Sequence, residues 1–409
     1  MSFDTIRRTA VIGAGTMGSD LSLLLAFADF DVIVIDRSKE ALDRLGDKQR
    51  ASMDEIRAAG ITQETYEDVE KRITTTTNLA DIKDVDFVLE AVAEDLDAKR
   101  KVFKKLDKKL PMRVIFATNT SSIRTTDIAK GLKGAKRLGG MHFSNPPIQS
   151  PLVEVVKGEK TTEETLRAIF WVAEKIGKTP VVLRKDVNGM VLDRILMSAG
   201  TEALWAIHKK EVTPEEIEVR HRLIGFPVGF PIGADLVGLD IMLAMSKNYR
   251  RVYGERFRVP EKMLEARIKE GKLGKKSGQG FFDWSKGNPV IDMKLEGKYD
   301  ATRTIAVTTN EAFWLLRDKV ADAETINKIV MLGFRSLVGI GELADAIGLD
   351  KLLDILKERY KKTGLEVYKP CPLLVEYVNK GWTGKAAGRG FYTYPAPAPA
   401  LAETIKVSP

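Results

Sequence analysis

The feature that most constrains the fold of this chain is an internal repeat in its second half. TEALWAI at 201 leads to GKKSGQGFFDW, and NEAFWLL at 310 leads in the same order to GKAAGRGFYTY. Trp205 matches Trp314 and Gly280 matches Gly390, so the offset between the matching motifs is nearly constant. Two unrelated bundles that share Gly- and Phe-rich turns would not keep one offset over about 90 residues. The repeat therefore indicates a tandem duplication of one helical domain.

The first half of the chain has a different periodicity. Short apolar runs alternate with helical stretches up to about residue 184, as in βα units that build a parallel sheet. Beyond Asn188 the strand signal largely stops and the periodicity is helical. Strands are predicted at 9–13, 31–36, 85–92, 113–118 and 152–156, a helix at 162–177, and a last strand at TPVVL.

A charged segment interrupts this alternation between residues 39 and 72. It carries two helical patterns, DKQRASMDEIRAAG and TQETYEDVEKRI. We expect a helical excursion that projects from the sheet. At the other end of the chain, YPAPAPALAETIKVSP is typical of a semi-extended Pro/Ala spacer.

Composition excludes several classes of protein. A chain of 409 residues is too long to be one small module. Its apolar fraction of 44% and charged fraction of 30% are typical of a globular protein. A single cysteine excludes an intramolecular disulfide and argues against a cysteine metal site, and no metal site is predicted. The net charge of +8 is mixed along the chain, which argues against nucleic acid and suits a polyanionic small molecule. Because no apolar signal-peptide core precedes the first predicted strand and no apolar run reaches the length of a membrane span, we expect a cytoplasmic protein with no membrane partner.

A glycine-rich loop, GAGTMG, follows the first predicted strand and opens the first helix. Gly13 permits a tight turn, Gly15 lets the backbone approach a pyrophosphate, and Gly18 lets the helix pack closely on the strand. Thr16 and Met17 stand at the helix N-terminus, whose amide groups and dipole favour an anion. The loop predicts a dinucleotide-binding domain.

An acidic residue indicates which dinucleotide is bound. Asp36 ends the second predicted strand and follows Gly18 at close to the spacing that this fingerprint requires. A carboxylate there can accept both hydrogen bonds of an adenosine ribose diol and repels a 2′-phosphate, which favours NAD over NADP. The neighbouring Arg37 weighs the other way, because a guanidinium can accommodate that phosphate.

Among the three histidines, His142 has a candidate partner. It ends a predicted strand in GGMHFSNP, and Glu154 lies twelve residues on in LVEVV. A strand, a turn through two prolines and a returning strand would place Glu154 opposite His142. Such a pair can take a hydroxyl proton while a hydride leaves the same carbon, with the carboxylate holding the imidazole tautomer. A lone histidine beside a phenylalanine can equally be a packed core residue, and we expect surface or packing roles for His208 and His221.

Small polar residues follow another predicted strand. Asn119 to Ser122 read NTSS directly after RVIFAT, and an open α/β sheet places its ligand groups at such carboxyl ends. Ser121 is therefore a candidate to bond a substrate hydroxyl or a nicotinamide. Ser122 is expected to cap the helix that begins near Thr125.

Taken together, these motifs resemble the L-3-hydroxyacyl-CoA dehydrogenases. The resemblance covers about residues 8 to 285 and rests on GAGTMG with Asp36, EAVAEDLDAK, NTSS, GMHFSNP, LVEVV and GKKSGQGFF, in that order. It implies an α/β Rossmann-type N-terminal domain followed by two tandem all-α 3-hydroxyacyl-CoA dehydrogenase C-terminal-type domains. The implied activity is the NAD-dependent oxidation of a (3S)-3-hydroxyacyl-CoA, with short-chain 3-hydroxybutyryl-CoA expected, to a 3-oxoacyl-CoA, a step of fatty acid beta-oxidation.

The expected domain boundaries follow from the repeat and the resemblance. We place the NAD-binding domain at 1–186, the first helical domain at 187–287 and the second at 298–394. A Pro/Ala-rich tail or linker is expected at 395–409.

The resemblance also implies roles for single residues. His142 matches the family's general base, Glu154 the acid that orients it, and Ser121 and Asn145 match residues that contact both substrate and cofactor. Ser52 and Asp193 match substrate-binding positions. The positions implied to bind the cofactor also include Gly13, Gly15, Thr16, Met17, Gly18, Asp36, Glu94, Lys99 and Lys276.

The chain departs from the family's pattern in places. Ala59 stands where a CoA-contacting lysine is expected, so that contact would come from Lys48 or Arg57. Asp193 stands where the family has an asparagine near the active site; it cannot donate an amide hydrogen bond, and its charge could change rate or substrate preference. The second helical copy lacks the second lysine of the GKK loop, which indicates a structural, non-catalytic copy.

The resemblance implies an acyl-CoA substrate and partners of two kinds. A crotonase-type hydratase, as a fused domain or separate protein, accompanies two-copy members, and the chain is expected to be a monomer or a homodimer. Two alternatives stay open: a dehydrogenase of a non-CoA 3-hydroxy acid or sugar acid, and an inactive crystallin-like relative.

Overall fold

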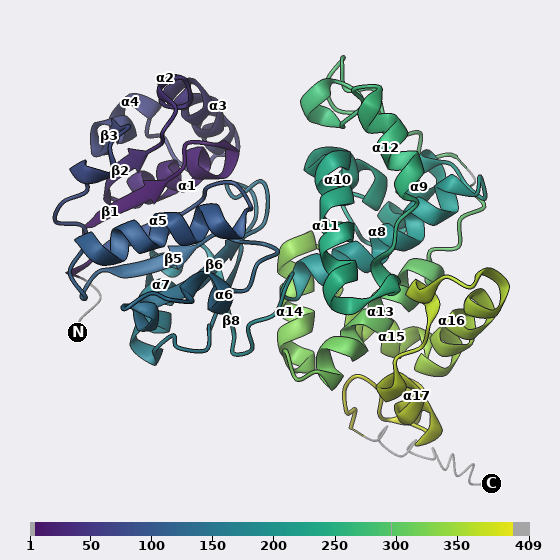
Figure 1. Ribbon diagram of the computed structural model, residues 1–409. Helices are drawn as coiled ribbons and strands as arrows, with labels where there is room; N and C mark the ends of the chain where they lie inside the picture. The colour runs from purple at the N-terminus through teal and green to yellow at the C-terminus, as the bar shows by residue number, and fades with distance from the viewer. Residues whose placement is uncertain (1–4, 296, 396–409) are drawn as a thin grey trace, which may run out of the picture.

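The chain forms two lobes joined by one crossing of the backbone (Figure 1). The computed structural model describes residues 5–295 and 297–395, so the predicted spacer at 396–409 lies outside the described residues. The N-terminal lobe, purple to blue in Figure 1, is built around a sheet, and the second lobe, teal to yellow, is helical. The α/β and all-α halves predicted from periodicity are both present.

One eight-stranded sheet runs through the first lobe, in the order β3-β2-β1-β4-β5-β6-β7-β8. The six strands from β1 to β6 are parallel, β7 is antiparallel to β6, and β8 is parallel to β7. The carboxyl ends of β1, β4, β5 and β6 therefore meet at one edge, where an open sheet of this kind binds ligands. The strands are β1 (Arg8–Ile12), β2 (Asp31–Ile35), β3 (Ile73–Thr76), β4 (Phe87–Glu90), β5 (Ile115–Thr118), β6 (Leu138–Phe143), β7 (Leu152–Val156) and β8 (Thr179–Leu183).

Helices cover both faces of this sheet, which explains why inner strands such as β1, β4 and β7 are largely apolar and do not alternate. On one face, α1 (Thr16–Phe27) and α7 (Glu163–Lys175) share a core with β1, β2, β6 and β7. On the other face, α5 (Leu96–Lys109) and α6 (Thr125–Ala129) pack on β4 and β5 through residues such as Phe103 and Phe116. Figure 1 shows α5 lying across the near face.

The charged excursion after β2 is helical as predicted, but it is docked on the domain. It contains α2 (Lys39–Asp43), α3 (Leu45–Ala58) and α4 (Tyr66–Val69). α3 packs against α1 through buried Met53 and Ile56, and the Gln49 amide donates to the Ser22 hydroxyl at 2.8 Å. The sparse apolar residues of α3 are thus its buried stripe, typical of an amphipathic surface helix.

The second helical pattern of this segment predicts a longer helix than the structure contains. α4 starts at a capping box formed by Thr65 and Asp68 and is followed by the 3₁₀ turn η2 (Glu70–Arg72). Ile73 then begins β3, an edge strand that the sequence pattern does not predict. The segment ITTT lacks apolar alternation, since this edge strand buries little of its side chains.

The helical lobe contains two copies of one arrangement. Within the described residues each copy has five α-helices, and the spacing between equivalent helices is nearly constant. The first copy comprises α8 (Leu192–His208), α9 (Pro214–Leu223), α10 (Phe230–Val237), α11 (Leu239–Tyr253), η5 (Glu255–Phe257), α12 (Glu261–Lys269) and η6 (Lys275–Ser277). The second comprises α13 (Thr302–Arg317), α14 (Ala323–Phe334), α15 (Ile340–Ile347), α16 (Leu349–Thr363), η7 (Glu366–Tyr368), α17 (Pro372–Asn379) and η8 (Lys385–Ala387).

A buried aspartate repeats between the copies and explains the constant spacing of their final turns. Asp235 in α10 accepts hydrogen bonds from two backbone N–H groups of the GQGFF turn. Asp345, its equivalent in α15, accepts the corresponding two from GRGFY. A Cβ on Gly280 or Gly390 would lie 2.0 or 2.1 Å from the respective aspartate oxygen, so only glycine fits there.

The two copies face each other through α8 and α13, with reciprocal buried ion pairs. Arg194 on α8 bonds Glu311 on α13, and Arg303 on α13 bonds Glu202 on α8. The two arginines occupy equivalent positions of the repeat, and so do the two glutamates. The copies therefore pack as an isologous pair does in a two-fold dimer.

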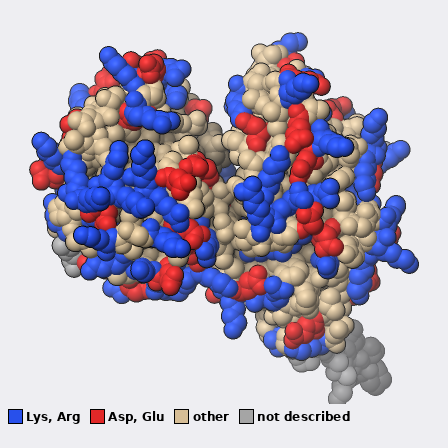
Figure 2. Space-filling view, in the orientation of Figure 1, with Lys and Arg blue, Asp and Glu red and all other residues tan. Residues whose placement is uncertain are grey.

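The surface is unevenly charged. Figure 2 shows a cleft, open at the top of the view, between the lobes, and a dense group of basic side chains over the near face of the first lobe. The helix α5, which lies across that face in Figure 1, carries five exposed lysines: Lys101, Lys104, Lys105, Lys108 and Lys109. The sequence does not isolate this basic face, because acidic residues stand among the lysines. No helix within the described ranges is long and apolar enough to span a bilayer.

Candidate active site

The glycine loop has the geometry that a dinucleotide cradle requires. Gly13 has φ +111°, and a Cβ there would lie 2.6 Å from the Ala91 carbonyl oxygen. A Cβ on Gly18 would lie 1.9 Å from the Gly13 carbonyl oxygen, so these two glycines are needed for the fold itself. A Cβ on Gly15 would meet nothing within 4 Å, so Gly15 faces open space at the start of α1.

The structure fixes Asp36 beside this loop. One carboxylate oxygen accepts from the Ala14 N–H at 2.8 Å, and the other accepts from the Ser38 N–H at 2.9 Å. Thr16, at the N-terminus of α1, is exposed, and Met17 is half-buried. The amide-rich helix end, the open space at Gly15 and a fixed carboxylate at the end of β2 fit a pyrophosphate and a ribose diol.

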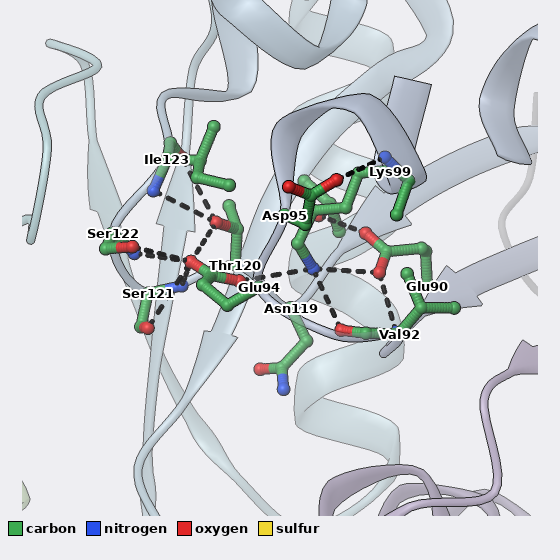
Figure 3. Close-up of polar contacts among 12 residues, drawn as sticks. Glu90, Val92, Glu94, Asp95, Lys99, Asn119, Thr120, Ser121, Ser122 and Ile123 are labelled. Atoms are coloured by element: carbon green, nitrogen blue, oxygen red, sulfur yellow. Dashed lines mark hydrogen bonds and ion pairs between the residues drawn. The ribbon is translucent and has the colours of Figure 1, made fainter. Parts of the chain in front are cut away.

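Glu94, in the loop after β4, holds the segment that follows β5 (Figure 3). Its Oε1 atom accepts from the N–H groups of Ser121 at 3.0 Å and Ser122 at 2.7 Å, and from the Thr120 hydroxyl at 2.7 Å. Burial opposes its ionisation, but the charge of Lys99 and these hydrogen bonds outweigh it and lower the pKa of Glu94. Glu94 is therefore a fixed anion that shapes the backbone around Ser121.

Lys99 lies beneath Glu94 and is itself buried. Its ammonium bonds Glu90 at 2.8 Å, lies 3.3 Å from Glu94 and donates to the Val92 carbonyl at 3.3 Å. Only 1% of its side chain is exposed, so in this structure it acts on its surroundings through Glu94. Sequence reasoning placed Glu94 and Lys99 at the cofactor, whereas the contacts seen here are with the Ser121 loop and the sheet.

The Ser121 loop is also fixed from its other side. The Asn119 side-chain oxygen accepts from the Phe143 N–H at 3.0 Å, which joins the ends of β5 and β6. Ser121 is partly exposed at the loop's tip. The expectation that Ser122 caps α6 is wrong: its hydroxyl bonds Glu94 at 3.0 Å. Asp186, from the chain after β8, instead accepts from the first two N–H groups of α6.

His142 and Glu154 are direct cross-strand partners. The antiparallel register of β6 and β7 places them opposite each other, and His142 Nδ1 lies 2.9 Å from Glu154 Oε2. His142 is 5% exposed and Glu154 is fully buried. The juxtaposition predicted from the spacing of the two residues is confirmed.

The helical lobe completes this pair. Glu154 Oε1 accepts from the N–H groups of Val191 at 3.0 Å and Leu192 at 3.3 Å, at the start of α8. The N-terminal end of a helix stabilises a carboxylate, so α8 holds the Glu154 side chain in place beside His142. Asp193, one residue further on, places Oδ2 3.8 Å from His142 Nε2. The imidazole thus has a carboxylate on each side.

These carboxylates change the titration of the imidazole. Burial disfavours the charged form, but the hydrogen bond to Glu154 and the charges of Asp193, Glu154 and Glu94 outweigh it and raise the pKa of His142 to about 9. Burial raises the pKa of Asp193 to about 6, against the attraction of the imidazolium. Between these values the site holds a protonated imidazole and an ionised Asp193.

Asn145 lies in the loop between β6 and β7, three residues after His142. It is exposed and follows Phe143 by two residues, after a partly buried Ser144. Lys178, which sequence reasoning missed, supports this loop from beneath: its ammonium donates to the carbonyls of Ile148 at 3.2 Å and Ser150 at 3.0 Å, and to Pro147. A lysine preceding a strand gives no sequence signal of such a contact.

Ser52 and Lys276 lie apart from the His142–Glu154 pair. Ser52, on α3, donates to Asp20 on α1 at 2.8 Å. Lys276, in η6 of the first helical copy, pairs with Asp240 at 2.6 Å and is exposed. No contact among the described residues joins either side chain to the imidazole.

The other two histidines have the roles expected of them. His208 is exposed, and His221 is buried between Thr304 and the Phe230 N–H. The described residues hold no group of three or more His, Cys, Asp or Glu side chains placed to bind a metal ion.

Asn188 is a second residue that sequence reasoning missed. Its amide donates to the Ser122 carbonyl at 2.7 Å, and its own carbonyl accepts from the Tyr253 hydroxyl at 2.6 Å. It therefore ties the Ser121 loop to α11 across the lobe junction. Its position next to glycine in the linker could have indicated a hinge.

Comparison with known proteins relates both lobes to one family. The model of the 3-hydroxyacyl-CoA dehydrogenase NAD-binding domain matches residues 8–187. The model of the 3-hydroxyacyl-CoA dehydrogenase C-terminal domain matches twice, at 189–284 and 299–394. The second match bears out the duplication inferred from the repeat.

Individual relatives agree with these matches. A probable 3-hydroxybutyryl-CoA dehydrogenase of Deinococcus radiodurans is 37% identical over 275 residues, which cover 67% of this chain and 99% of the relative. The fatty acid oxidation complex subunit alpha of Shewanella sp. strain MR-4 is 28% identical over 91% of this chain, which spans 55% of that subunit. The crystal structure of 3-hydroxybutyryl-CoA dehydrogenase from Escherichia coli K12 superposes with a TM-score of 0.79 at 26% identity, covering 92% of this chain and all of that one.

Proposed function

The chain belongs to the 3-hydroxyacyl-CoA dehydrogenase family of NAD-dependent oxidoreductases, and we propose that it oxidises short-chain (3S)-3-hydroxyacyl-CoA, with His142 as the general base. The observation that carries this proposal is the buried His142–Glu154 pair, closed by the first N–H groups of α8. An imidazole so oriented can move a proton at the carbon from which a hydride leaves.

The cofactor site is proposed at the carboxyl edge of the sheet. Gly13, Gly15 and Gly18 shape the loop, and the N-terminus of α1 at Thr16 and Met17 would hold the pyrophosphate. Asp36 would accept hydrogen bonds from the ribose hydroxyls. NAD bound there would supply the acceptor for the hydride that leaves C3 of the substrate.

Proton transfer is assigned to His142. For oxidation, neutral Nε2 accepts the proton of the 3-hydroxyl, and Glu154 at Nδ1 fixes the tautomer and stabilises the imidazolium formed. Glu154 is held in position because two N–H groups of α8 bond one of its oxygens and the imidazole bonds the other. General acid–base catalysis of this kind contributes roughly 10²–10⁴-fold to the rate.

Two polar residues are proposed to place the substrate. Ser121, on the loop held by Glu94, and Asn145, on the loop supported by Lys178, flank the end of β6 that bears His142. Their role is to fix the 3-hydroxyl and the thioester relative to the cofactor, which lowers the entropic part of the barrier. Glu94 and Lys99 position the Ser121 loop, and Ser52 and Lys276 are proposed contacts for the outlying parts of the ligands.

The short acyl chain is supported by the relatives. The Deinococcus radiodurans and Escherichia coli proteins are named for 3-hydroxybutyryl-CoA. We propose the same substrate here. The match to subunit alpha of a fatty acid oxidation complex supports a hydratase as the partner that supplies the 3-hydroxyacyl thioester.

The second helical copy is proposed to be structural. Thr302 occupies the position equivalent to Asp193, and α13 faces α8 instead of a sheet domain. On this basis the domains are proposed at 1–186, 187–287 and 298–394, with one active site in the chain.

A substrate comparison tests the function. NADH formation should be followed with (S)-3-hydroxybutyryl-CoA, its free acid and longer (S)-3-hydroxyacyl-CoA esters, each with NAD and with NADP. The proposal predicts turnover that requires the CoA ester and NAD and is fastest with the four-carbon chain. Turnover of the free acid at an equal rate would instead indicate a dehydrogenase of non-CoA hydroxy acids, and binding of NAD without any turnover would indicate an inactive relative.

A further inference from the structure

Asp193 is a charged residue at a position where the proposed mechanism needs none. It stands in the first turn of α8, 14% exposed, with its carboxylate facing His142 Nε2 at 3.8 Å. In the part of the chain that the structure describes, His142 is its only ion-pair partner. An acidic residue is common in a first helical turn, but there it normally faces solvent, whereas this one faces the imidazole.

The geometry leaves the imidazole free to react. At 3.8 Å the two groups attract as charges but form no hydrogen bond, so the Nε2 proton stays available to a substrate oxygen. Nδ1 on the opposite side of the ring is occupied by Glu154 at 2.9 Å. Two carboxylates on one imidazole favour its cationic form by Coulomb attraction.

The remaining charged and titratable groups around the site are few. Glu94, from the loop after β4, adds negative charge toward both His142 and Asp193. From α11, the buried Tyr249 faces Asp193 and stays neutral because burial raises its pKa. Arg194 is turned away, bonded to Glu311. Among these neighbours no cation competes with His142 for Asp193.

We propose that Asp193 is a second carboxylate of the proton-transfer centre, which with Glu154 keeps His142 protonated in the resting enzyme, ready to reduce a 3-oxoacyl-CoA. This deepens the proposed function and relies on it for the reaction. In that direction C3 receives a hydride from NADH, the C3–O double bond becomes single, and the Nε2 proton passes to the oxygen, which leaves neutral His142. Oxidation must first remove that proton and therefore requires alkaline conditions.

The test replaces the carboxylate of Asp193 with a neutral amide. Asp193→Asn keeps the size of the side chain and removes the charge, and the pH dependence of kcat/KM is measured in both directions. The oxidation profile loses activity toward acid and the reduction profile loses activity toward alkali, both through His142. The proposal predicts that both limits move to lower pH by about one unit or more in the variant, while Asp350→Asn, an exposed acid in the first turn of α16, moves neither.

Two results would overturn the proposal. If Asp193→Asn lowers both rates but leaves the pH limits in place, Asp193 acts only by shape or helix stabilisation. The second result is independent of turnover: NMR titration of the His142 imidazole in the cofactor-free protein, assigned with His142→Gln, should show its midpoint at lower pH in Asp193→Asn. An unchanged midpoint would refute the proposal even if no CoA ester were a substrate, and a shifted midpoint without turnover would refute only the proposed function.

Discussion

At the scale of single residues, burial decides how this chain uses its histidines. His142 and His221 are both buried, yet their titration differs because their neighbours differ. Carboxylates surround His142, whereas His221 has neutral partners, Thr304 at Nε2 and the Phe230 N–H at Nδ1. Burial alone therefore lowers the pKa of His221 to about 4.

The stability of the protein should consequently fall as the pH falls through this range. The pKa of His221 in the folded chain lies below its unfolded value of about 6.5, so the unfolded chain binds the proton first. Between about pH 6.5 and pH 4 this residue is expected to remove up to about 3 kcal/mol from the free energy of unfolding. Urea unfolding of the wild type and His221→Gln at pH 7 and pH 5 checks this. The wild type should lose more stability than the variant over that interval; an equal loss would contradict the assignment.

The same residue scale shows what the sequence could not predict of the site. The sequence predicts the pairing of His142 with Glu154 because two antiparallel strands joined by a turn place residues at this spacing opposite each other. The roles of Asp186 and Lys178 depend on contacts with groups that are distant in sequence. The sequence predicts Ser122 as the helix cap because capping rules consider only residues close in sequence. The first N–H groups of α6 instead bond Asp186, which is distant in sequence.

At the scale of elements, the β1–loop–α1 unit contains some glycines that the fold requires and another that leaves space for a ligand. Gly18 contacts the Gly13 carbonyl, and Gly15 faces open space. The sequence motif does not distinguish these glycines. In the structure, Gly18 permits close packing of α1 on β1, and Gly15 leaves space beside the loop.

Alanine substitution should separate these tasks. Gly15→Ala is expected to leave the free energy of unfolding nearly unchanged, because its backbone conformation suits alanine and nothing lies within 4 Å. NAD binding should weaken at least tenfold, because the methyl group occupies space the pyrophosphate needs. Calorimetric titration with NAD and urea unfolding measure the two effects.

Gly18→Ala should show the opposite order of effects. A Cβ 1.9 Å from the Gly13 carbonyl oxygen forces α1 away from β1, so stability is expected to fall by about 1–3 kcal/mol, as overpacking does. Gly233→Ala, where nothing lies within 4 Å, serves as the control. A stable Gly18→Ala protein with normal NAD affinity would show that the helix–strand contact is not as tight as described.

Individual strands and helices also show where prediction from the sequence pattern fails. Buried parallel strands such as β1 and β4 were predicted because both faces are covered and their residues are apolar throughout. β3 was missed because an edge strand buries little, and its threonines carry no alternation. The excursion after β2 was predicted as helical but not as docked, since a narrow apolar stripe within a charged segment does not say which surface it covers.

At the scale of the whole molecule, the duplication creates an internal pair. Arg194–Glu311 and Arg303–Glu202 repeat at equivalent positions across α8 and α13. Glu311 also accepts from Arg256 at 3.0 Å, so one carboxylate of the second copy neutralises two arginines of the first. The α8 helix that bears Asp193 and binds Glu154 is held from behind by this contact.

Removing that carboxylate should destabilise both copies together. Glu311→Gln leaves buried Arg194 without its charge partner, and breaking a buried pair on one side costs about 3–5 kcal/mol. Glu376→Gln, which breaks an exposed pair with Lys380, should cost at most about 1 kcal/mol. Urea unfolding followed by tryptophan fluorescence compares them, since four of the five tryptophans lie in the two copies, Trp205 and Trp284 in the first and Trp314 and Trp382 in the second. A similar small loss in both variants would mean that the copies are held by apolar packing alone.

The central claim is that His142 moves the substrate proton, and one measurement tests it most directly. NADH formation from (S)-3-hydroxybutyryl-CoA and NAD should be compared for the wild type, His142→Gln and, as the matched control, His208→Gln at an exposed histidine. The account predicts that His142→Gln lowers kcat roughly 10²–10⁴-fold while NAD affinity is retained, and that His208→Gln matches the wild type. Wild-type turnover by His142→Gln would contradict the account.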